Sequence, residues 1–125
     1  MHLAAHQLIV VVEGDEGLNQ AIDRLLYAAG LSVMTFSSSE ACLASPAVHR
    51  AACLVVDVHL PGLSGVELRR QLNECGIAPA VIYITGNDDR STREEVQRSG
   101  PCAFLVKPFR GPALLSAIND ALERG

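Results

Sequence analysis

Four polar residues of types that take part in phosphoryl chemistry stand at the ends of apolar runs. They are Glu13 after "LIVVV", Asp57 ending "CLVVD", Thr85 ending "AVIYIT" and Lys107 ending "CAFLVK". Carboxylates suit a hard cation such as Mg²⁺, which also binds phosphate oxygens. A lysine neutralises charge on phosphoryl oxygens, a threonine hydroxyl can hydrogen-bond to one of them, and an aspartate can be the nucleophile. Together the four residue types are suited to phosphoryl transfer at Asp57 with help from a divalent cation.

The elements that must position these residues are short strands and helices in alternation. Five apolar runs of strand length are separated by segments with helical spacing, and the least certain helix is the polar stretch 88–99. Continuous apolar runs indicate strands covered on both faces, so we expect an α/β fold with a five-stranded parallel sheet and helices on both faces. The predicted strands span 8–12, 31–36, 53–57, 80–85 and 102–107.

The order of the strands decides whether the four polar residues meet. In a doubly wound sheet of order 2-1-3-4-5, sites form outside the carboxyl ends of the strands, at the switch point between strands 1 and 3. Glu13 and Asp57 are then neighbours, and Thr85 and Lys107 flank Asp57 from the other side. The four residues are predicted to converge on one pocket.

Length and composition predict a single domain that spans residues 1–125. The chain is 49% hydrophobic with a formal charge of −4, which gives no basic surface for nucleic acid. We see no signal peptide and no apolar run long enough to cross a membrane, so the expected location is the cytoplasm. The four cysteines lack metal-ligand spacing and are expected to be reduced and mostly buried.

Three stretches resemble the receiver domains of two-component response regulators, whose fold is flavodoxin-like. They are "LVVDVHLPGLSGVEL" at 54–68, "VIYITGNDD" at 81–89 and "FLVKPF" at 104–109. The resemblance implies that Asp57 accepts a phosphoryl group from a sensor histidine kinase or phosphotransfer protein. It implies that Lys107 contacts the phosphoryl oxygens and that Thr85 shifts to engage them. The backbone carbonyl of His59 is implied as a Mg²⁺ ligand, with Glu13 and Asp57.

The same resemblance implies further roles. Phe104 stands where the family has a switch aromatic, and His59 and Asn87, each two residues beyond a site residue, are expected to tune dephosphorylation. The Lys107 to Pro108 bond is predicted to be cis, since cis bonds are essentially confined to X-Pro. A homodimer is expected through the face formed by the fourth helix, fifth strand and fifth helix, with no direct nucleic-acid or membrane contact. The stretch "ITGNDD" is similar to receivers attached to transcription factors.

The stretch after the first strand departs from the family pattern. Receivers usually have consecutive acids there, whereas this chain has Glu13, Gly14 and Asp15. Gly14 removes a metal-binding carboxylate, so weaker Mg²⁺ binding is expected. Asp15 could replace it as a ligand, but aspartate just before a helix more often caps that helix, and capping is the favoured interpretation.

Two other functions remain open. A receiver-like interaction module that works without phosphate is supported by Gly14. A phosphohydrolase with an aspartate nucleophile would use similar residues, but such enzymes usually have an acid two positions after the nucleophile, where this chain has His59. Nucleotide binding is disfavoured because neither glycine-rich phosphate motif is present. The leading interpretation is a receiver that catalyses at most its own phosphorylation and dephosphorylation.

Overall fold

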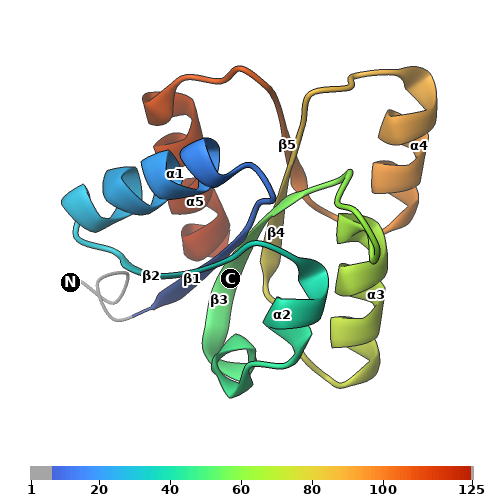
Figure 1. Ribbon diagram of the computed structural model, residues 1–125, viewed down its shortest axis with the longest axis horizontal. Coiled ribbons are helices and arrows are strands. Elements are labelled where there is room, and N and C mark those ends of the chain that lie inside the picture. Colours follow the sequence, from blue (N-terminus) through green and yellow to red (C-terminus); the bar gives the residue numbers. More distant parts are fainter. Residues whose placement is uncertain (1–6, 125) are drawn as a thin grey trace.

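The computed structural model describes residues 7–124 and contains one parallel sheet of five strands (Figure 1). Its order, β2-β1-β3-β4-β5, confirms the predicted topology. The strands are β1 Leu8–Val12, β2 Ser32–Phe36, β3 Ala51–Asp57, β4 Ala80–Thr85 and β5 Ala103–Val106. The three central strands, β1, β3 and β4, are short apolar runs that are almost wholly buried, whereas the edge strands β2 and β5 are more exposed.

Four α-helices and one short 3₁₀ helix lie between successive strands, and a fifth α-helix follows β5. Polar side chains fix where the helices begin: Asp15, Ser38, Ser64 and Asp89 each accept a hydrogen bond from a backbone N–H in the first turn of α1, α2, α3 and α4. The helices are α1 Glu16–Ala28, α2 Ser39–Leu43, η2 Pro46–Arg50, α3 Gly65–Glu74, α4 Arg90–Arg98 and α5 Gly111–Arg124.

Alternate side chains of each central strand enter two separate hydrophobic cores. On one face Val11 and Val55 pack with α1 and α5, and on the other Val10 and Val56 pack with α2 and α3 and with Val96 of α4. Because both faces are covered, the strands are apolar without interruption. The polar residues that follow them therefore lie at the edge of the sheet.

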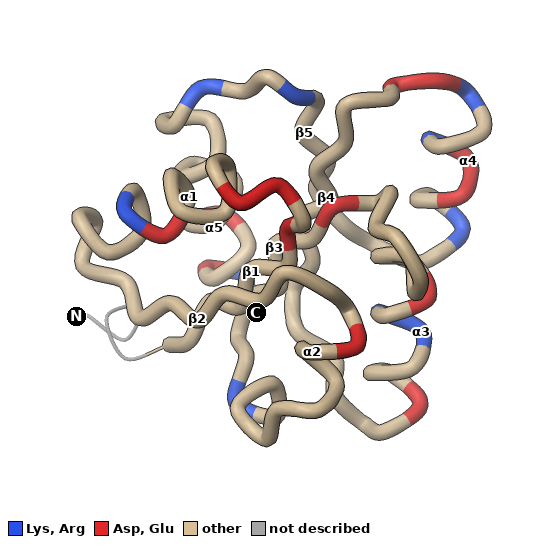
Figure 2. The backbone as a smooth tube through the Cα atoms, viewed as in Figure 1, with Lys and Arg blue, Asp and Glu red and all other residues tan. Residues whose placement is uncertain are grey.

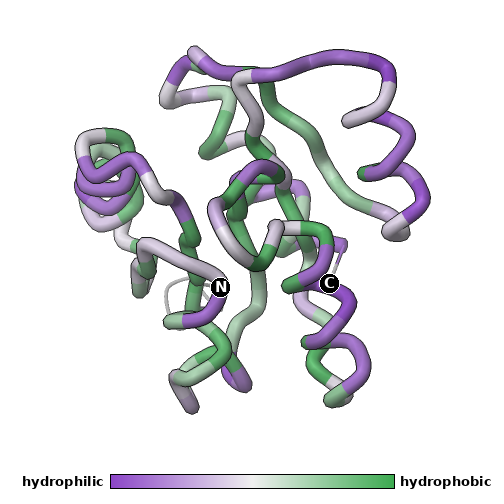
Figure 3. The backbone as a smooth tube through the Cα atoms, turned by 45° about the vertical axis from the view of Figure 1, so that its right-hand side comes forward, coloured by the Kyte–Doolittle hydropathy of each residue, from purple (hydrophilic) through white to green (hydrophobic). Residues whose placement is uncertain are grey.

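Helix α4 is the polar element whose existence was least certain from the sequence. It forms, but only Thr92 and Val96 of its residues are buried. Figure 3 shows the strands as hydrophobic and α4, with the loop before it, as predominantly hydrophilic. Few apolar contacts hold this helix to the sheet, so polar contacts contribute more to its position.

Several sequence-based expectations need correction. Strand β3 begins two residues earlier than predicted, at Ala51, and η2 was not foreseen. The expectation that the cysteines are mostly buried is half wrong, because Cys42 and Cys53 are buried whereas Cys75 and Cys102 are exposed. The predicted single domain includes residues 1–6 and 125, which lie outside the described part. Between residues 7 and 124, no helix is long and apolar enough to cross a membrane.

Candidate functional site at the carboxyl edge of the sheet

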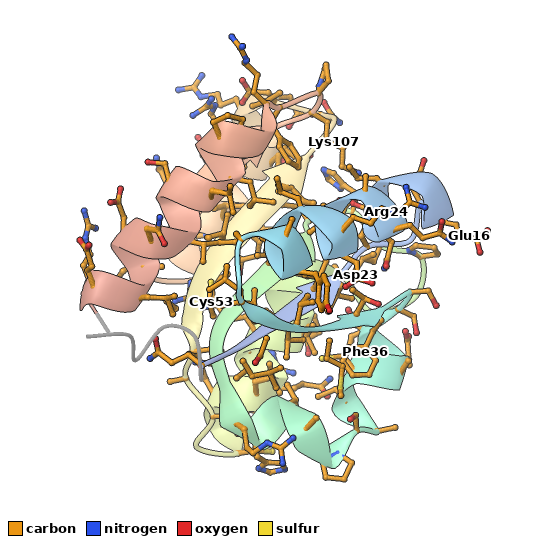
Figure 4. The ribbon with its side chains drawn as sticks, turned by 90° about the vertical axis from the view of Figure 1, so that its left-hand side faces the viewer. Glu16, Asp23, Arg24, Phe36, Cys53 and Lys107 are labelled. Carbon is orange, nitrogen blue, oxygen red and sulfur yellow. The ribbon has the colours of Figure 1, made fainter. Side chains whose placement is uncertain are left out.

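The four polar residues singled out in the sequence lie together at the carboxyl edge of the sheet. The register of the strands brings them together, because the strands are paired so that their last residues lie side by side. The pairs are Val12 with Val56, Asp57 with Ile84, and Thr85 with Val106. The next residue along β1 is Glu13 and the next along β5 is Lys107. Figure 2 shows acidic segments after β1 and at β3 on the same edge as basic residues after β5. In Figure 4, Lys107 lies near the end of the sheet where the site is, whereas Cys53, near the start of β3, lies well away from it.

A lysine bridges two buried carboxylates at the centre of the site. Lys107 Nζ lies 2.7 Å from Asp57 Oδ2, to which it donates a hydrogen bond, and 2.9 Å from Glu13 Oε1. Glu13 is 2% exposed and Asp57 7% exposed. The contact with Glu13 is at ion-pair distance without hydrogen-bond geometry, so Oε1 is a buried acceptor with no donor among the described residues. The three side chains carry a net charge of −1 and can attract a further cation.

The electrostatic environment raises the pKa of Lys107. Partial burial by itself lowers that pKa, but the hydrogen bond to Asp57 and the negative charges of Asp57 and Glu13 more than compensate. Because the pKa is raised in the folded state, the resulting stabilisation is complete below the ordinary lysine pKa and is lost as the pH rises through the raised value. Lys107 therefore remains a cation at neutral pH.

The turn after β3 holds the second oxygen of Asp57. The backbone N–H of His59 donates to Asp57 Oδ1 at 2.8 Å, and Val58 N–H donates to Ile84 O at 2.9 Å. Gly65, the first residue of α3, lies against the same strand end: a Cβ there would lie 2.3 Å from Asp57 O, too close for any side chain. The requirement for glycine at this position follows from the tertiary structure.

Thr85 is fully buried, and its hydroxyl is engaged by its own loop. Its Oγ1 accepts a hydrogen bond from Asn87 N–H at 3.0 Å and donates to Asn87 O at 3.2 Å. Lys107 N–H donates to Thr85 O at 2.7 Å, and the following bond to Pro108 is cis, as predicted. Any move of the Thr85 hydroxyl toward Asp57 must give up its contacts with Asn87.

The turn after β1 uses its acids in different ways. Asp15 Oδ1 accepts from Leu18 N–H at 2.9 Å, so its side chain caps α1, the favoured interpretation. The backbone N–H of Asp15 donates to Glu13 Oε2 at 2.9 Å and fixes that carboxylate. Gly14 is exposed, and a Cβ there would make only ordinary contacts, the nearest at 3.7 Å. A shallow pocket of about 330 Å³ opens beside Glu13 and Gly14.

Sequence reasoning missed three residues that position the site. Asn19 donates to Glu13 O and to Phe36 O, each at 3.0 Å, and so ties the end of β1 to the end of β2. Thr92 Oγ1 lies 3.2 Å from His59 Nε2 and connects α4 to the turn after Asp57. Arg93 lies over Phe104 in β5. Neither Asn19 nor Arg93 could be singled out from the sequence, because Phe36 and Phe104, which they contact, belong to other elements.

Comparison with known proteins agrees with this geometry. A family model described as "Response regulator receiver domain" matches residues 9–119, and the chain belongs to this family. Nodulation protein W of Bradyrhizobium diazoefficiens is 37% identical over 117 residues, which is 94% of this chain and 52% of that protein. Transcriptional regulatory protein FixJ of Azorhizobium caulinodans is 35% identical over 91% of this chain and 54% of its own length. The chain spans about half the length of these curated relatives.

Solved structures show the same fold. The crystal structure of FixJ-N aligns with a TM-score of 0.84 at 32% identity and covers 95% of both chains. The BeF3-activated DrrB receiver domain aligns with a TM-score of 0.85 at 29% identity and covers 94% of this chain and 98% of that one. Receiver domains are generally signalling modules rather than enzymes, interact with histidine kinases or phosphotransfer proteins, and typically bind Mg²⁺ for phosphorylation. Neither alternative function is favoured by these matches.

Proposed function

We propose that this chain is a single phosphoacceptor domain in which Asp57 takes a phosphoryl group from a histidine kinase or phosphotransfer protein. The observation that carries the proposal is the bridge from Lys107 Nζ to Asp57 Oδ2, 2.7 Å, at the switch point of the sheet. Asp57 is buried enough to exclude most water yet retains an exposed fraction of 7% through which a donor can approach. The product is an acyl phosphate, formed when Asp57 attacks phosphorus and the donor leaves.

The residues of the site fit Mg²⁺, although with fewer carboxylates than usual. The residues from 7 to 124 contain no cluster of three acidic, histidine or cysteine side chains arranged to hold a metal. Mg²⁺ needs only one or two carboxylates, with water and phosphate oxygens as its other ligands. Glu13, whose Oε1 is paired with the Lys107 ammonium but accepts no hydrogen bond within residues 7–124, and Asp57 would hold the ion, together with the carbonyl oxygen of His59. The bound ion would supply positive charge for the phosphoryl oxygens.

The remaining residues orient and stabilise the phosphoryl group. The Lys107 ammonium is already hydrogen-bonded to Asp57 and can transfer its contact to a phosphoryl oxygen. The Thr85 hydroxyl can exchange its bonds with Asn87 for a second phosphoryl oxygen, a movement that links chemistry at Asp57 to the loop before α4. Phe104 would respond by changing its packing, and the face formed by α4, β5 and α5 would change its contacts, including those of a homodimer.

The cellular setting is also part of the proposal. The curated relatives are about twice as long as this chain, and one of them is a transcriptional regulatory protein. We infer a cytoplasmic regulator whose output depends on contacts made by this domain with another protein or domain, without direct nucleic-acid binding. His59 and Asn87, each two residues beyond a site residue, would set the lifetime of the acyl phosphate by helping or hindering the approach of water to Asp57.

The deciding experiment is phosphorylation by a small acyl phosphate, followed by intact mass spectrometry. The wild type is expected to gain one phosphoryl group at saturating Mg²⁺ and Asp57→Asn none, since the amide is not a nucleophile. Lys107→Ala should slow uptake about 100-fold or more, a loss typical of removing one group that stabilises transition-state charge.

Other outcomes assign other functions. Absence of uptake by the wild type at any Mg²⁺ concentration would contradict the proposal and favour an interaction module that works without phosphate. Continuous hydrolysis of a phosphate monoester, which is not an acyl phosphate donor, would indicate a phosphohydrolase. The circular dichroism of Asp57→Asn should match that of the wild type, so that a negative result reflects chemistry.

A further inference from the structure

Helix α4 meets the sheet through a stacked pair of side chains from two different elements. The guanidinium carbon of Arg93, in the middle of α4, lies 4.9 Å from the ring centroid of Phe104 in β5. This distance is within the range of a cation–π interaction, and arginine is well suited to it because its guanidinium is planar. Phe104 is half-buried and packs against the core on the α3 side, so Arg93 covers its outer surface.

A carboxylate in the loop before α4 holds the same guanidinium. Arg93 Nη2 donates to Asp88 Oδ2 at 2.9 Å, and Arg93 Nε donates to Asp88 Oδ1. The pairing is bidentate and fixes the plane of the guanidinium as well as its position. It lowers the pKa of Asp88, mainly through the hydrogen bond from Arg93, so the carboxylate is charged at neutral pH.

Asp88 lies directly after the residue that holds the Thr85 hydroxyl. Thr85 Oγ1 exchanges two hydrogen bonds with the backbone of Asn87, and Asp88 follows Asn87 in the same loop. When the Thr85 hydroxyl leaves Asn87, the loop loses these two bonds. A displacement of the loop would strain the pairing of Asp88 with Arg93, because Arg93 belongs to a helix whereas Asp88 belongs to the loop.

We propose that Asp88 and Arg93 form a latch that holds Phe104 in its observed position and opposes the switch at Thr85. The inference rests on the proposed function and adds two positioning residues to it. The latch couples three elements: Asp88 belongs to the loop after β4, Arg93 to α4 and Phe104 to β5. Release of Asp88 frees the guanidinium, exposes the outer surface of Phe104 and loosens α4, whose apolar contacts are few.

The first test needs no phosphorylation. In the unmodified protein, the side-chain protons of Arg93 should show an upfield ring-current shift in the NMR spectrum that disappears in Phe104→Leu. The chain has three phenylalanines and no tryptophan, which simplifies assignment. Asp88→Asn should reduce this shift at least two-fold, since the guanidinium then samples positions away from the ring. A merely structural role for Asp88 would leave the shift unchanged.

The second test compares two arginines of the same helix. Arg93→Ala should accelerate amide hydrogen exchange in residues 86–98 about five-fold, the loss expected for one exposed ion pair with one cation–π contact. Alanine is the best helix former, so faster exchange cannot arise from helix propensity. Arg90→Ala is the matched control: it removes the same charge and the 3.3 Å pair with Glu94, but Arg90 is 91% exposed and should change exchange less than two-fold.

The last test concerns the switch. Arg93→Ala should speed phosphorylation of Asp57 by an acyl phosphate about five-fold, and Arg90→Ala should not. Equal rates in Arg93→Ala and wild type, or absence of the ring-current shift in the wild type, would overturn the latch. Failure of Asp57 to accept phosphate would instead overturn the proposed function, while the first two tests would still report whether the latch exists.

Discussion

Substitution of Gly14 by aspartate is expected to strengthen metal binding without disturbing the fold. The φ angle of Gly14 is not positive, and an added Cβ would meet Ser37 O at 3.7 Å and Leu60 Cδ2 at 3.9 Å, both ordinary contacts. A side chain therefore fits without strain. The new carboxylate would lie next to Glu13, one of the residues proposed to hold Mg²⁺.

The size of the effect follows from Coulomb's law. A carboxylate within about 5 Å of a divalent cation, at an effective dielectric constant of roughly 40 to 80, gains about 1.5 to 3 kcal/mol. This corresponds to roughly 10- to 100-fold tighter binding. Without metal, the same charge between Glu13 and Asp15 should lower the free energy of unfolding by about 0.5 kcal/mol, a typical surface electrostatic effect. The variant should therefore gain more stability from added Mg²⁺ than the wild type does.

Isothermal titration calorimetry measures the affinity for Mg²⁺. Urea unfolding with and without the ion measures the free energy of unfolding. Gly14→Asn is the control, because asparagine has nearly the shape of aspartate without its charge. Equal Mg²⁺ affinity in Gly14→Asp and Gly14→Asn would refute the reasoning, since the gain is assigned to charge alone. Phosphorylation of Asp57 should also require less Mg²⁺ in Gly14→Asp, and the same control applies.

Further predictions concern packing, reactivity and lifetime. Gly65→Ala should lower the free energy of unfolding by about 2 kcal/mol or more in urea melts, because the added Cβ would lie 2.3 Å from Asp57 O. Burial raises the pKa of Cys42 to about 11 and that of Cys53 to about 12, so at pH 8 iodoacetamide should modify only the other two cysteines until the protein unfolds. Mass spectrometry of the native protein would contradict this prediction if all four cysteines were rapidly modified by iodoacetamide. His59→Ala, which breaks the contact with α4, should alter the lifetime of the phosphorylated protein more than its rate of formation, as followed by phosphate release.

Much of the fold could be predicted because its signals are local. Apolar runs of strand length separated by helical spacing define a doubly wound sheet, and Ser64 and Asp15 mark helix starts through their own side chains. Helix α4 was uncertain for the opposite reason: its sequence has little apolar periodicity, and the contacts that position it come from elsewhere in the fold. The early start of β3 at Ala51 reflects pairing with β1, which begins opposite it at Leu8.

The sequence by itself determined which residues stand at the strand ends, and hence that Glu13, Asp57, Thr85 and Lys107 share one edge of the sheet. Only the tertiary structure decided which of their side-chain atoms contact one another and at what distance. That the Lys107 ammonium lies between two carboxylates, 2.7 and 2.9 Å away, depends on the register of four strands, β1, β3, β4 and β5. Contacts such as Arg93 over Phe104 join side chains of two different elements. Their energies come from distance and geometry in space, which residue types and spacing do not contain.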